Sequence, residues 1–244
     1  HFGNGGDGII LVCPSKVADA KMKMYNLDGS EGKMCGNGIR CVGKFLYDHG
    51  MVDINEKDEI TIETLSGIKK LKAYTSGGKV NRLRVDMGKA ILDPKEIPVV
   101  LDGDKVVDRP VEIAGKNYNI TCVSMGNPHC VVFMDDIDNL DIETVGPEFE
   151  NDKLFPERVN TEFVTVLDDH TIKMRVWERG SGETWACGTG ACAVAVAACE
   201  NGFCKKGEDI KIKLKGGDLI INYTDETVYM TGNAEKVFEG EVEV

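Results

Sequence analysis

Apolar and polar residues alternate along many short segments of this chain, whereas helical spacing of apolar residues is clearest in two places. Period-two alternation is typical of strands with one buried face. It predicts short strands at residues 59–64, 119–124, 162–167, 172–177, 209–214 and 218–223. A helical stripe of Ile39, Val42, Phe45 and Leu46 predicts a helix that ends at Gly50, a residue suited to a helix C-terminus.

The second helical segment, residues 191–199, is apolar on every side. Such a helix must be enclosed by other elements, so we expect the short strands to wrap around it. Residues 88–110 contain three prolines and little periodicity, and they are the expected connection between two halves of the chain.

The chain contains an internal repeat with an offset of 152 residues, from Cys35 to Cys187. In residues 35–50 and 187–202, Cys-Gly-x-Gly coincides, as do a valine seven residues after the cysteine and a glycine fifteen after it. Flanking strand-like segments also match, 23–26 with 175–178 and 58–62 with 208–212. The repeat predicts a duplicated fold with two related halves.

The second half also contains a polar turn, SMGNPH at residues 124–129, about 60 residues before Cys187. The repeat offset puts its counterpart upstream of His1. We therefore expect the first half to lack its opening strands.

Charge and cysteine content narrow the class of protein. A net charge of −12, from 41 acidic and 29 basic residues, argues against binding nucleic acid through phosphates. The sequence holds no apolar run as long as a membrane span, which argues against a membrane partner. Nine cysteines without a CxxC pair fit neither a disulfide scaffold nor a typical zinc site. We expect reduced thiols in a cytoplasmic protein, with no metal.

Cys35 and Cys187 each stand before Gly-x-Gly at the start of a predicted helix. Unpaired N–H groups and the helix dipole favour a thiolate there, which predicts pKa values below about 8.5. The same N–H groups can hold a carboxylate that approaches the glycines closely. If the halves face each other, two thiols flank one carbon, which is the arrangement for inverting an amino acid Cα without a cofactor.

Five motifs carry a resemblance to a known family. They are MCGNGIRC at 34–41, GNPH at 126–129, VNTEF at 159–163, WERG at 177–180 and ACGTG at 186–190. In order and spacing over essentially the whole chain, they resemble the diaminopimelate epimerases. The resemblance implies an isomerase that converts LL- to meso-diaminopimelate without pyridoxal phosphate or another cofactor, in lysine and peptidoglycan biosynthesis.

The resemblance also implies an α+β fold of two pseudo-symmetric domains, each a strand barrel wrapped around a central helix. The expected N-terminal domain is 1–87, completed by the tail 233–244, and the expected C-terminal domain is 88–232. A homodimer is expected as well.

Site residues follow from the resemblance by position. Cys35 and Cys187 match the catalytic acid/base pair, and His129 and Glu178 match residues that tune the pKa values of the cysteines. The residues that match substrate-binding positions are Asn26, Gly36, Asn37, Asn127, Asn160, Glu178, Arg179, Gly188 and Thr189. A substrate with two amino acid ends needs an arginine for a carboxylate, a carboxylate for an ammonium and several amides.

The sequence departs from the family pattern in its opening segment, which we expect to be missing, and at two positions. Gly8 stands where some members have a substrate-contacting glutamine, and Phe238 replaces a tyrosine associated with dimer contact. Among the remaining cysteines, Cys41, Cys192 and Cys199 lie within helices and are expected to be packing residues.

Three alternatives remain open at this point. A racemase similar to proline racemases would use the same pair of cysteines, although those enzymes tend to carry a histidine where Asn37 stands. A phenazine-type isomerase of similar fold would lack the cysteine pair. From another class, the chain could be a non-catalytic binding or thiol-redox module, against which the missing CxxC and the paired anion-holding turns argue.

Overall fold

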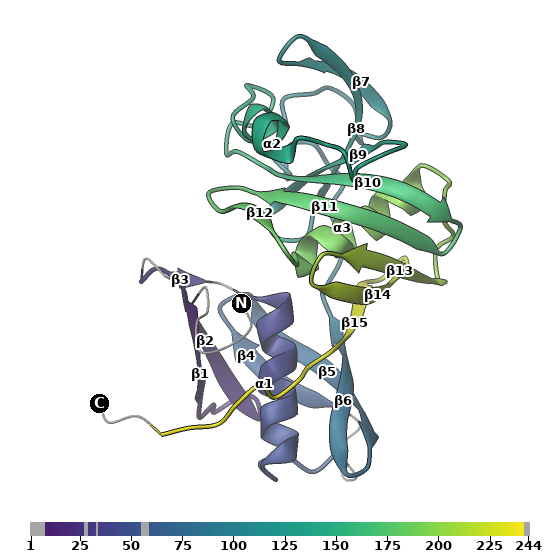
Figure 1. Cartoon of the computed structure of the whole chain (residues 1–244). Coiled ribbons are helices and arrows are strands. Elements are labelled where there is room, and N and C mark those ends of the chain that lie inside the picture. Colours follow the sequence, from purple (N-terminus) through teal and green to yellow (C-terminus); the bar gives the residue numbers. More distant parts are fainter. Residues whose placement is uncertain (1–7, 27–28, 33, 55–58, 242–244) are drawn as a thin grey trace. The chain divides into compact units, whose positions relative to one another are not determined.

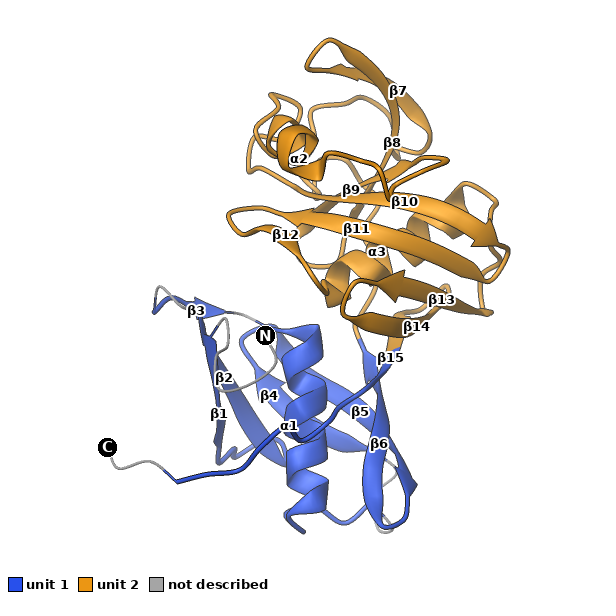
Figure 2. Cartoon of the chain, viewed as in Figure 1, with its two compact units in different colours: residues 1–86, 231–244 blue, residues 87–230 orange. Residues whose placement is uncertain are grey.

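The computed structural model describes residues 8–26, 29–32, 34–54 and 59–241. Contacts between residues divide the chain into two compact units (Figure 2). Unit 1 consists of His1–Asp86 and Thr231–Val244, and unit 2 of Met87–Met230. Most of the regular structure is strand, and three helices are described, so the α+β class expected from the sequence is confirmed.

Unit 1 is a sheet with one long helix beside it (Figure 1). The strands are β1 (Gly8–Cys13), β2 (Ala20–Asn26), β3 (Glu31–Gly32), β4 (Ile60–Thr64), β5 (Gly67–Ser76) and β6 (Lys79–Asp86). Neighbouring strands follow the order β1-β2-β4-β5-β6, with β3 beside β2. Helix α1 (Gly36–Asp48) packs against β4, β5 and β6.

Unit 2 has more strands and two helices (Figure 1). Its elements are β7 (Arg109–Ile113), β8 (Lys116–Ser124), β9 (Pro128–Phe133), α2 (Ile142–Glu150), β10 (Asn160–Asp168), β11 (Thr171–Glu178), β12 (Gly182–Thr184), α3 (Gly188–Glu200), β13 (Asp209–Leu214) and β14 (Gly217–Tyr223). Strand order is β14-β13-β11-β10-β9-β8-β7, with β12 beside β11. The last strand, β15 (Val228–Asn233), begins in unit 2 and ends in unit 1.

The predicted duplication is visible in the strand pairing of the two units. In unit 1, β1 pairs antiparallel with β2, and β2 pairs parallel with β4. In unit 2, β10 pairs antiparallel with β11, and β11 pairs parallel with β13. The two long helices also end alike, because Gly50 and Gly202 both have positive φ and the N–H of each bonds a carbonyl of the last turn. The repeat in the sequence therefore corresponds to a repeat of backbone structure.

The helix predicted to be apolar on every side is enclosed, as expected. From Ala191 to Ala198, every residue of α3 is fully buried, and the helix packs against β8, β9, β10, β13 and β14. Each of the six predicted strands lies within or close to an observed one, namely β4, β8, β10, β11, β13 and β14. The small side chains of α3 let these strands approach its backbone closely.

Helix α1 departs from its predicted stripe at one position. Ile39, Val42 and Leu46 are buried, but Phe45 is 40% exposed and its ring lies 4.1 Å from that of His49. The reason is that α1 packs against strands along one side only. Phe45 lies at the edge of the apolar stripe and therefore stays at the surface.

Residues 88–110, which the sequence suggests as a connection, form part of unit 2. Ile97, Val99 and Val106 from this stretch belong to the same buried apolar cluster as Phe149 and Phe163. Prolines interrupt regular structure here without removing the segment from the core, so this expectation was wrong.

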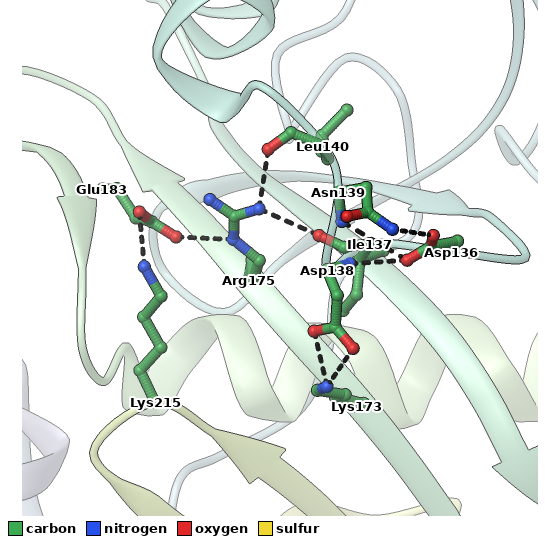
Figure 3. Close-up of polar contacts among 9 residues, drawn as sticks. All are labelled: Asp136, Ile137, Asp138, Asn139, Leu140, Lys173, Arg175, Glu183 and Lys215. Carbon is green, nitrogen blue, oxygen red and sulfur yellow. Dashed lines mark hydrogen bonds and ion pairs between the residues drawn. The ribbon is translucent and has the colours of Figure 1, made fainter.

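A polar cluster holds β11 and β12 against the loop that precedes α2 (Figure 3). Nη1 of Arg175 donates to the carbonyl oxygens of Ile137 at 2.9 Å and Leu140 at 2.7 Å, and its Nε donates to Glu183 at 2.7 Å. The second carboxylate oxygen of Glu183 accepts from Lys215 at 2.6 Å. Because β11 ends at Glu178, this cluster fixes the strand that delivers two predicted site residues.

Candidate active site

Both predicted catalytic cysteines are the N-cap residues of long helices. Cys35 precedes α1 and Cys187 precedes α3, each with an extended backbone. The Cys35 sulfur accepts from the N–H of Gly38 at 3.3 Å, and the Cys187 sulfur accepts from the N–H of Gly190 at 3.4 Å. The first N–H groups of a helix have no carbonyl partner within it, so each thiol lies beside donors suited to an anion. The two thiols therefore have the same backbone position and the same sulfur contact, although Cys187 is buried and Cys35 is partly buried.

In unit 1, a buried arginine organises the turn that follows Cys35. Arg40 donates to the side-chain oxygen of Asn37 at 3.1 Å and to the carbonyl of Gly36 at 3.1 Å. Its Nε also donates to the carbonyl of Asn233 in the C-terminal tail at 3.3 Å. The sequence assigned no role to Arg40, although it lies inside the CGNGIRC motif. It positions Gly36 and Asn37, two of the predicted carboxylate anchors.

Asn26, another predicted substrate-binding residue, ends strand β2 and is exposed. Its side-chain amide donates to the hydroxyl of Ser30 at 3.0 Å, and the backbone groups of the two residues also pair. These hydrogen bonds with Ser30 hold the amide of Asn26 in a fixed orientation.

In unit 2, several predicted site residues form one hydrogen-bonded chain that ends at Cys187. The Nε2 of His129 lies 3.1 Å from the side-chain oxygen of Asn127, whose amide nitrogen donates to the hydroxyl of Thr189 at 3.3 Å. That hydroxyl lies 3.5 Å from the Cys187 sulfur. At the other end, Nδ1 of His129 lies 2.7 Å from a carboxylate oxygen of Glu162. Glu162 belongs to the VNTEF motif, but sequence reasoning gave it no role.

The other residues of unit 2 that the sequence predicts to bind substrate meet where β10 and β11 are paired. Buried Asn160 donates to the carbonyl of Pro128 at 3.0 Å and accepts from the N–H of Arg179 at 3.0 Å. Arg179 is partly exposed, and one of its Nη groups donates to the carbonyl of Glu157 at 2.9 Å. Glu178 accepts a hydrogen bond from the hydroxyl of Thr184 on β12. An acid, an arginine and an amide are thus gathered at one end of β11.

A buried carboxylate that the sequence did not reveal supports this turn. Glu150, the last residue of α2, is 6% exposed. It accepts hydrogen bonds from the indole of Trp177 at 2.7 Å, from the N–H of Gly180 at 2.9 Å and from Arg158 at 2.9 Å. Two of these residues, Trp177 and Gly180, flank Glu178 and Arg179 in the chain. A glutamate at a helix end usually faces water, so no pattern in the sequence marks this one.

One expectation about the cysteines was wrong. The helix start was expected to lower the pKa of both thiols, but burial raises the pKa of Cys187 well above its ordinary value, and the negative charges of Glu178 and Glu162 raise it further. Hydrogen bonds from Thr189 and Gly190 act in the opposite direction but are weaker. Because Cys187 is enclosed, loss of solvation outweighs the helix start.

The remaining helix cysteines differ in burial. Cys192 is buried in α3 and Cys199 is partly buried, as expected of packing residues. Cys41, however, is exposed on α1 and is not a packing residue. It lies on the face of α1 turned away from the strands, which explains the difference.

The predicted site residues thus form two groups. Asn26, Cys35, Gly36 and Asn37 belong to unit 1. Asn127, His129, Asn160, Glu178, Arg179, Cys187, Gly188 and Thr189 belong to unit 2. Among the residues that the structure describes, no three His, Cys, Asp or Glu side chains are grouped to hold a metal ion, and no helix is long and apolar enough to cross a membrane.

Comparison with known proteins agrees with the resemblance seen in the sequence motifs. The family model for diaminopimelate epimerase matches residues 1–92 and 121–237. A diaminopimelate epimerase of Acetivibrio thermocellus is 53% identical over 100% of this chain and 86% of its own length. One from Agathobacter rectalis is 52% identical over 100% of this chain and 87% of its own length.

Among solved structures, a probable proline racemase from Agrobacterium radiobacter K84 has a TM-score of 0.73 at 16% identity. The match covers 97% of this chain and 76% of the racemase chain. At this level of identity the likeness concerns the fold alone. It agrees with the expected α+β fold of two related halves.

Proposed function

Because the chain belongs to the diaminopimelate epimerase family, we propose that it converts LL-diaminopimelate to meso-diaminopimelate. The reaction inverts one Cα: a base removes the proton from one face and an acid returns a proton to the other face. The observation that carries this proposal is the matched pair of cysteines, Cys35 and Cys187, each capping a helix whose first N–H groups can hold a carboxylate.

The proposal assigns Cys187 and Cys35 complementary roles in each direction of the reaction. Since burial and nearby carboxylates raise its pKa, Cys187 keeps its proton at neutral pH and can donate it to the substrate carbon. Cys35 then acts as the base, and the roles exchange in the reverse reaction. An amino acid Cα–H is a very weak acid, so the charge that develops on the carboxylate must be stabilised in the transition state. The turns at Gly36-Asn37 and Gly188-Thr189 supply the N–H groups for this purpose.

Recognition of the distal amino acid end is the second part of the proposal. Glu178 would pair with an ammonium group, and Arg179 with a carboxylate in a charge-assisted hydrogen bond. Asn160 holds the backbone of Arg179, and the amides of Asn26 and Asn127 would complete the polar contacts. A substrate with only one amino acid end would leave these groups unpaired, which favours diaminopimelate over proline.

Several finer properties belong to the same proposal. We expect no cofactor, a role in lysine and peptidoglycan biosynthesis, and a cytoplasmic location. We also propose a homodimer. Val237 and Phe238 support it, because these adjacent apolar residues in the C-terminal tail are 74% and 60% exposed.

The experiment that tests the function is deuterium incorporation at Cα in D₂O, followed by NMR or mass spectrometry. LL-Diaminopimelate and L-proline are supplied separately to the wild-type chain. We expect exchange and epimerisation with diaminopimelate alone. Exchange with proline alone would contradict the proposal and favour a racemase similar to proline racemases, one of the alternatives that the sequence leaves open.

Matched variants connect that activity to the two thiols. Cys35→Ala and Cys187→Ala are each expected to abolish epimerisation, whereas Cys41→Ala, which alters an exposed cysteine of the same helix as Cys35, retains it. Substantial epimerisation by either of the first two variants would exclude the assigned roles.

A further inference from the structure

A chain of side chains within unit 2 connects a buried carboxylate to the sulfur of Cys187. We name it the Glu162 relay, and it consists of Glu162, His129, Asn127, Thr189 and Cys187. Successive polar atoms are separated by 2.7, 3.1, 3.3 and 3.5 Å. The members come from three places in the chain: Asn127 and His129 from the start of β9, Glu162 from β10, and Thr189 and Cys187 from the start of α3.

The carboxylate at the start of the relay is unusual in its burial. Glu162 and His129 are both 0% exposed, and burial raises the pKa of Glu162 although His129 opposes the shift. One oxygen of Glu162 contacts His129, while the other is buried without a hydrogen-bond partner. A buried carboxylate is costly unless it is paired, so one that is half satisfied calls for an explanation beyond packing.

Glu162 is also close to the reactive sulfur. A Cβ at Gly190 would lie 2.6 Å from a carboxylate oxygen of Glu162 and 3.2 Å from the Cys187 sulfur. The oxygen and the sulfur therefore lie less than about 6 Å apart, a separation at which two negative charges strongly disfavour each other. Glycine at position 190 is what allows this approach.

Hydrogen-bond directions along the relay are constrained by its chemistry. In the structure the oxygen of Asn127 faces His129, and an amide oxygen only accepts, so Nε2 of His129 must carry a proton. The amide nitrogen of Asn127 then donates to Thr189, which leaves the hydroxyl proton of Thr189 free to point at the sulfur. This direction stabilises a thiolate at Cys187.

Turning the Asn127 amide by 180° reverses every donor. Nε2 of His129 then accepts and carries no proton, the hydroxyl of Thr189 donates to the amide oxygen, and the thiol of Cys187 donates to Thr189. In both directions one proton lies between His129 and Glu162. In the first direction Nε2 of His129 carries a second proton, so the histidine–carboxylate pair is neutral while Cys187 is a thiolate. In the second direction Nε2 carries no proton, so the pair has one negative charge while Cys187 is a thiol.

We propose that Glu162 is a positioning residue which, through His129, Asn127 and Thr189, links the ionisation of Cys187 to the protonation of His129. The relay keeps two adjacent negative charges from forming when Cys187 loses its proton. Glu178 on β11 also faces Cys187, and Cys130 on β9 faces Glu162. The inference deepens the proposed function, because it concerns the acid/base group assigned there.

The test measures the ionisation of Cys187 without any substrate. The protein is treated briefly with iodoacetamide between pH 5 and pH 11, and alkylation of Cys187 is quantified by mass spectrometry of its peptide. In the wild type, two coupled groups should give a rate that rises in two steps with pH. Glu162→Gln keeps the shape of the side chain but removes its charge. Its profile should have a single step, displaced to lower pH by about one unit.

A second pair of variants keeps the test decisive if Glu162→Gln does not fold. Thr189→Val removes the hydroxyl that joins Asn127 to the sulfur, and its profile should also have a single step, whereas Thr189→Ser should restore two. Thr165→Val is the control, because the buried hydroxyl of Thr165 has no partner and lies outside the relay; it should keep the wild-type profile.

The outcomes separate the inference from the proposed function. A two-step profile that persists in folded Thr189→Val, or in folded Glu162→Gln, would overturn the relay, as would a single step in the wild type. Alkylation of Cys35, measured in the same digest, should not respond to either variant. Failure to epimerise diaminopimelate would defeat the proposed function but would leave these profiles unchanged.

Discussion

Substitution of Glu150 by glutamine tests how the substrate-binding turn is held. One oxygen of Glu150 accepts from Arg158 and from the N–H of Gly180, and the other accepts from the indole of Trp177. In Glu150→Gln the amide oxygen can keep the first two bonds, but the NH₂ group then faces the indole N–H. Two donors would then oppose each other in a partly buried place.

The expected magnitude follows from these contacts. Losing one charge-assisted hydrogen bond and leaving a buried donor unsatisfied costs about 2 to 3 kcal/mol. The ion pair with Arg158 adds less than about 1 kcal/mol, because that arginine is more than half exposed. For a protein of this size, the melting temperature should fall by roughly 5 to 10 °C.

Urea denaturation followed by tryptophan fluorescence is the appropriate assay, since Trp177 is itself a partner of Glu150. Glu148→Gln, an exposed change on the same helix, is the matched control and should be neutral. The Michaelis constant for diaminopimelate should also rise in Glu150→Gln, because Gly180 lies next to Arg179. If the two variants unfold at the same urea concentration, the reasoning about this carboxylate is refuted.

Two further predictions concern the framework of unit 2. Burial alone would raise the pKa of Glu183, but hydrogen bonds from Arg175 and Lys215 bring it below its usual value. Glu183 therefore stabilises the fold above its unfolded pKa of about 4.5 and loses that contribution as the pH falls through the lowered folded pKa. Urea midpoints of the wild type and Glu183→Gln should differ at pH 7, and the difference should shrink as the pH is lowered below about 4.5; a constant difference would contradict this. Gly190→Ala puts a methyl group 2.6 Å from the Glu162 carboxylate, so it should lower the free energy of unfolding by about 1 to 3 kcal/mol. An unchanged free energy of unfolding would contradict this.

Local patterns in the sequence predicted much of the fold because they depend on nearby residues. The repeat around Cys35 and Cys187 predicted two helix starts, and both cysteines are N-caps with the same sulfur contact. The fully apolar segment 191–199 predicted an enclosed helix, since such a helix has no face that can meet water.

What the sequence missed depends on contacts between distant residues. Glu162 and Glu150 look like ordinary strand and helix acids, and only the packing of other elements buries them. The exposure of Cys41 was missed for the same reason, because it depends on which face of α1 meets the strands. A low pKa was expected of Cys187 from the helix start alone. The burial of the thiol and the two nearby carboxylates, which raise the pKa, depend on distant residues.

The central claim, that two thiols act on opposite faces of one Cα, is tested most directly by the isotopic course of the first turnover. LL-Diaminopimelate is supplied in D₂O, and deuterium at Cα is measured early in both the product and the recovered substrate. A thiol holds a single proton, so two separate bases should put solvent deuterium into the meso product while the remaining LL substrate stays unlabelled. Equal labelling of substrate and product, or unlabelled product, would contradict the assignment of Cys35 and Cys187 as separate bases.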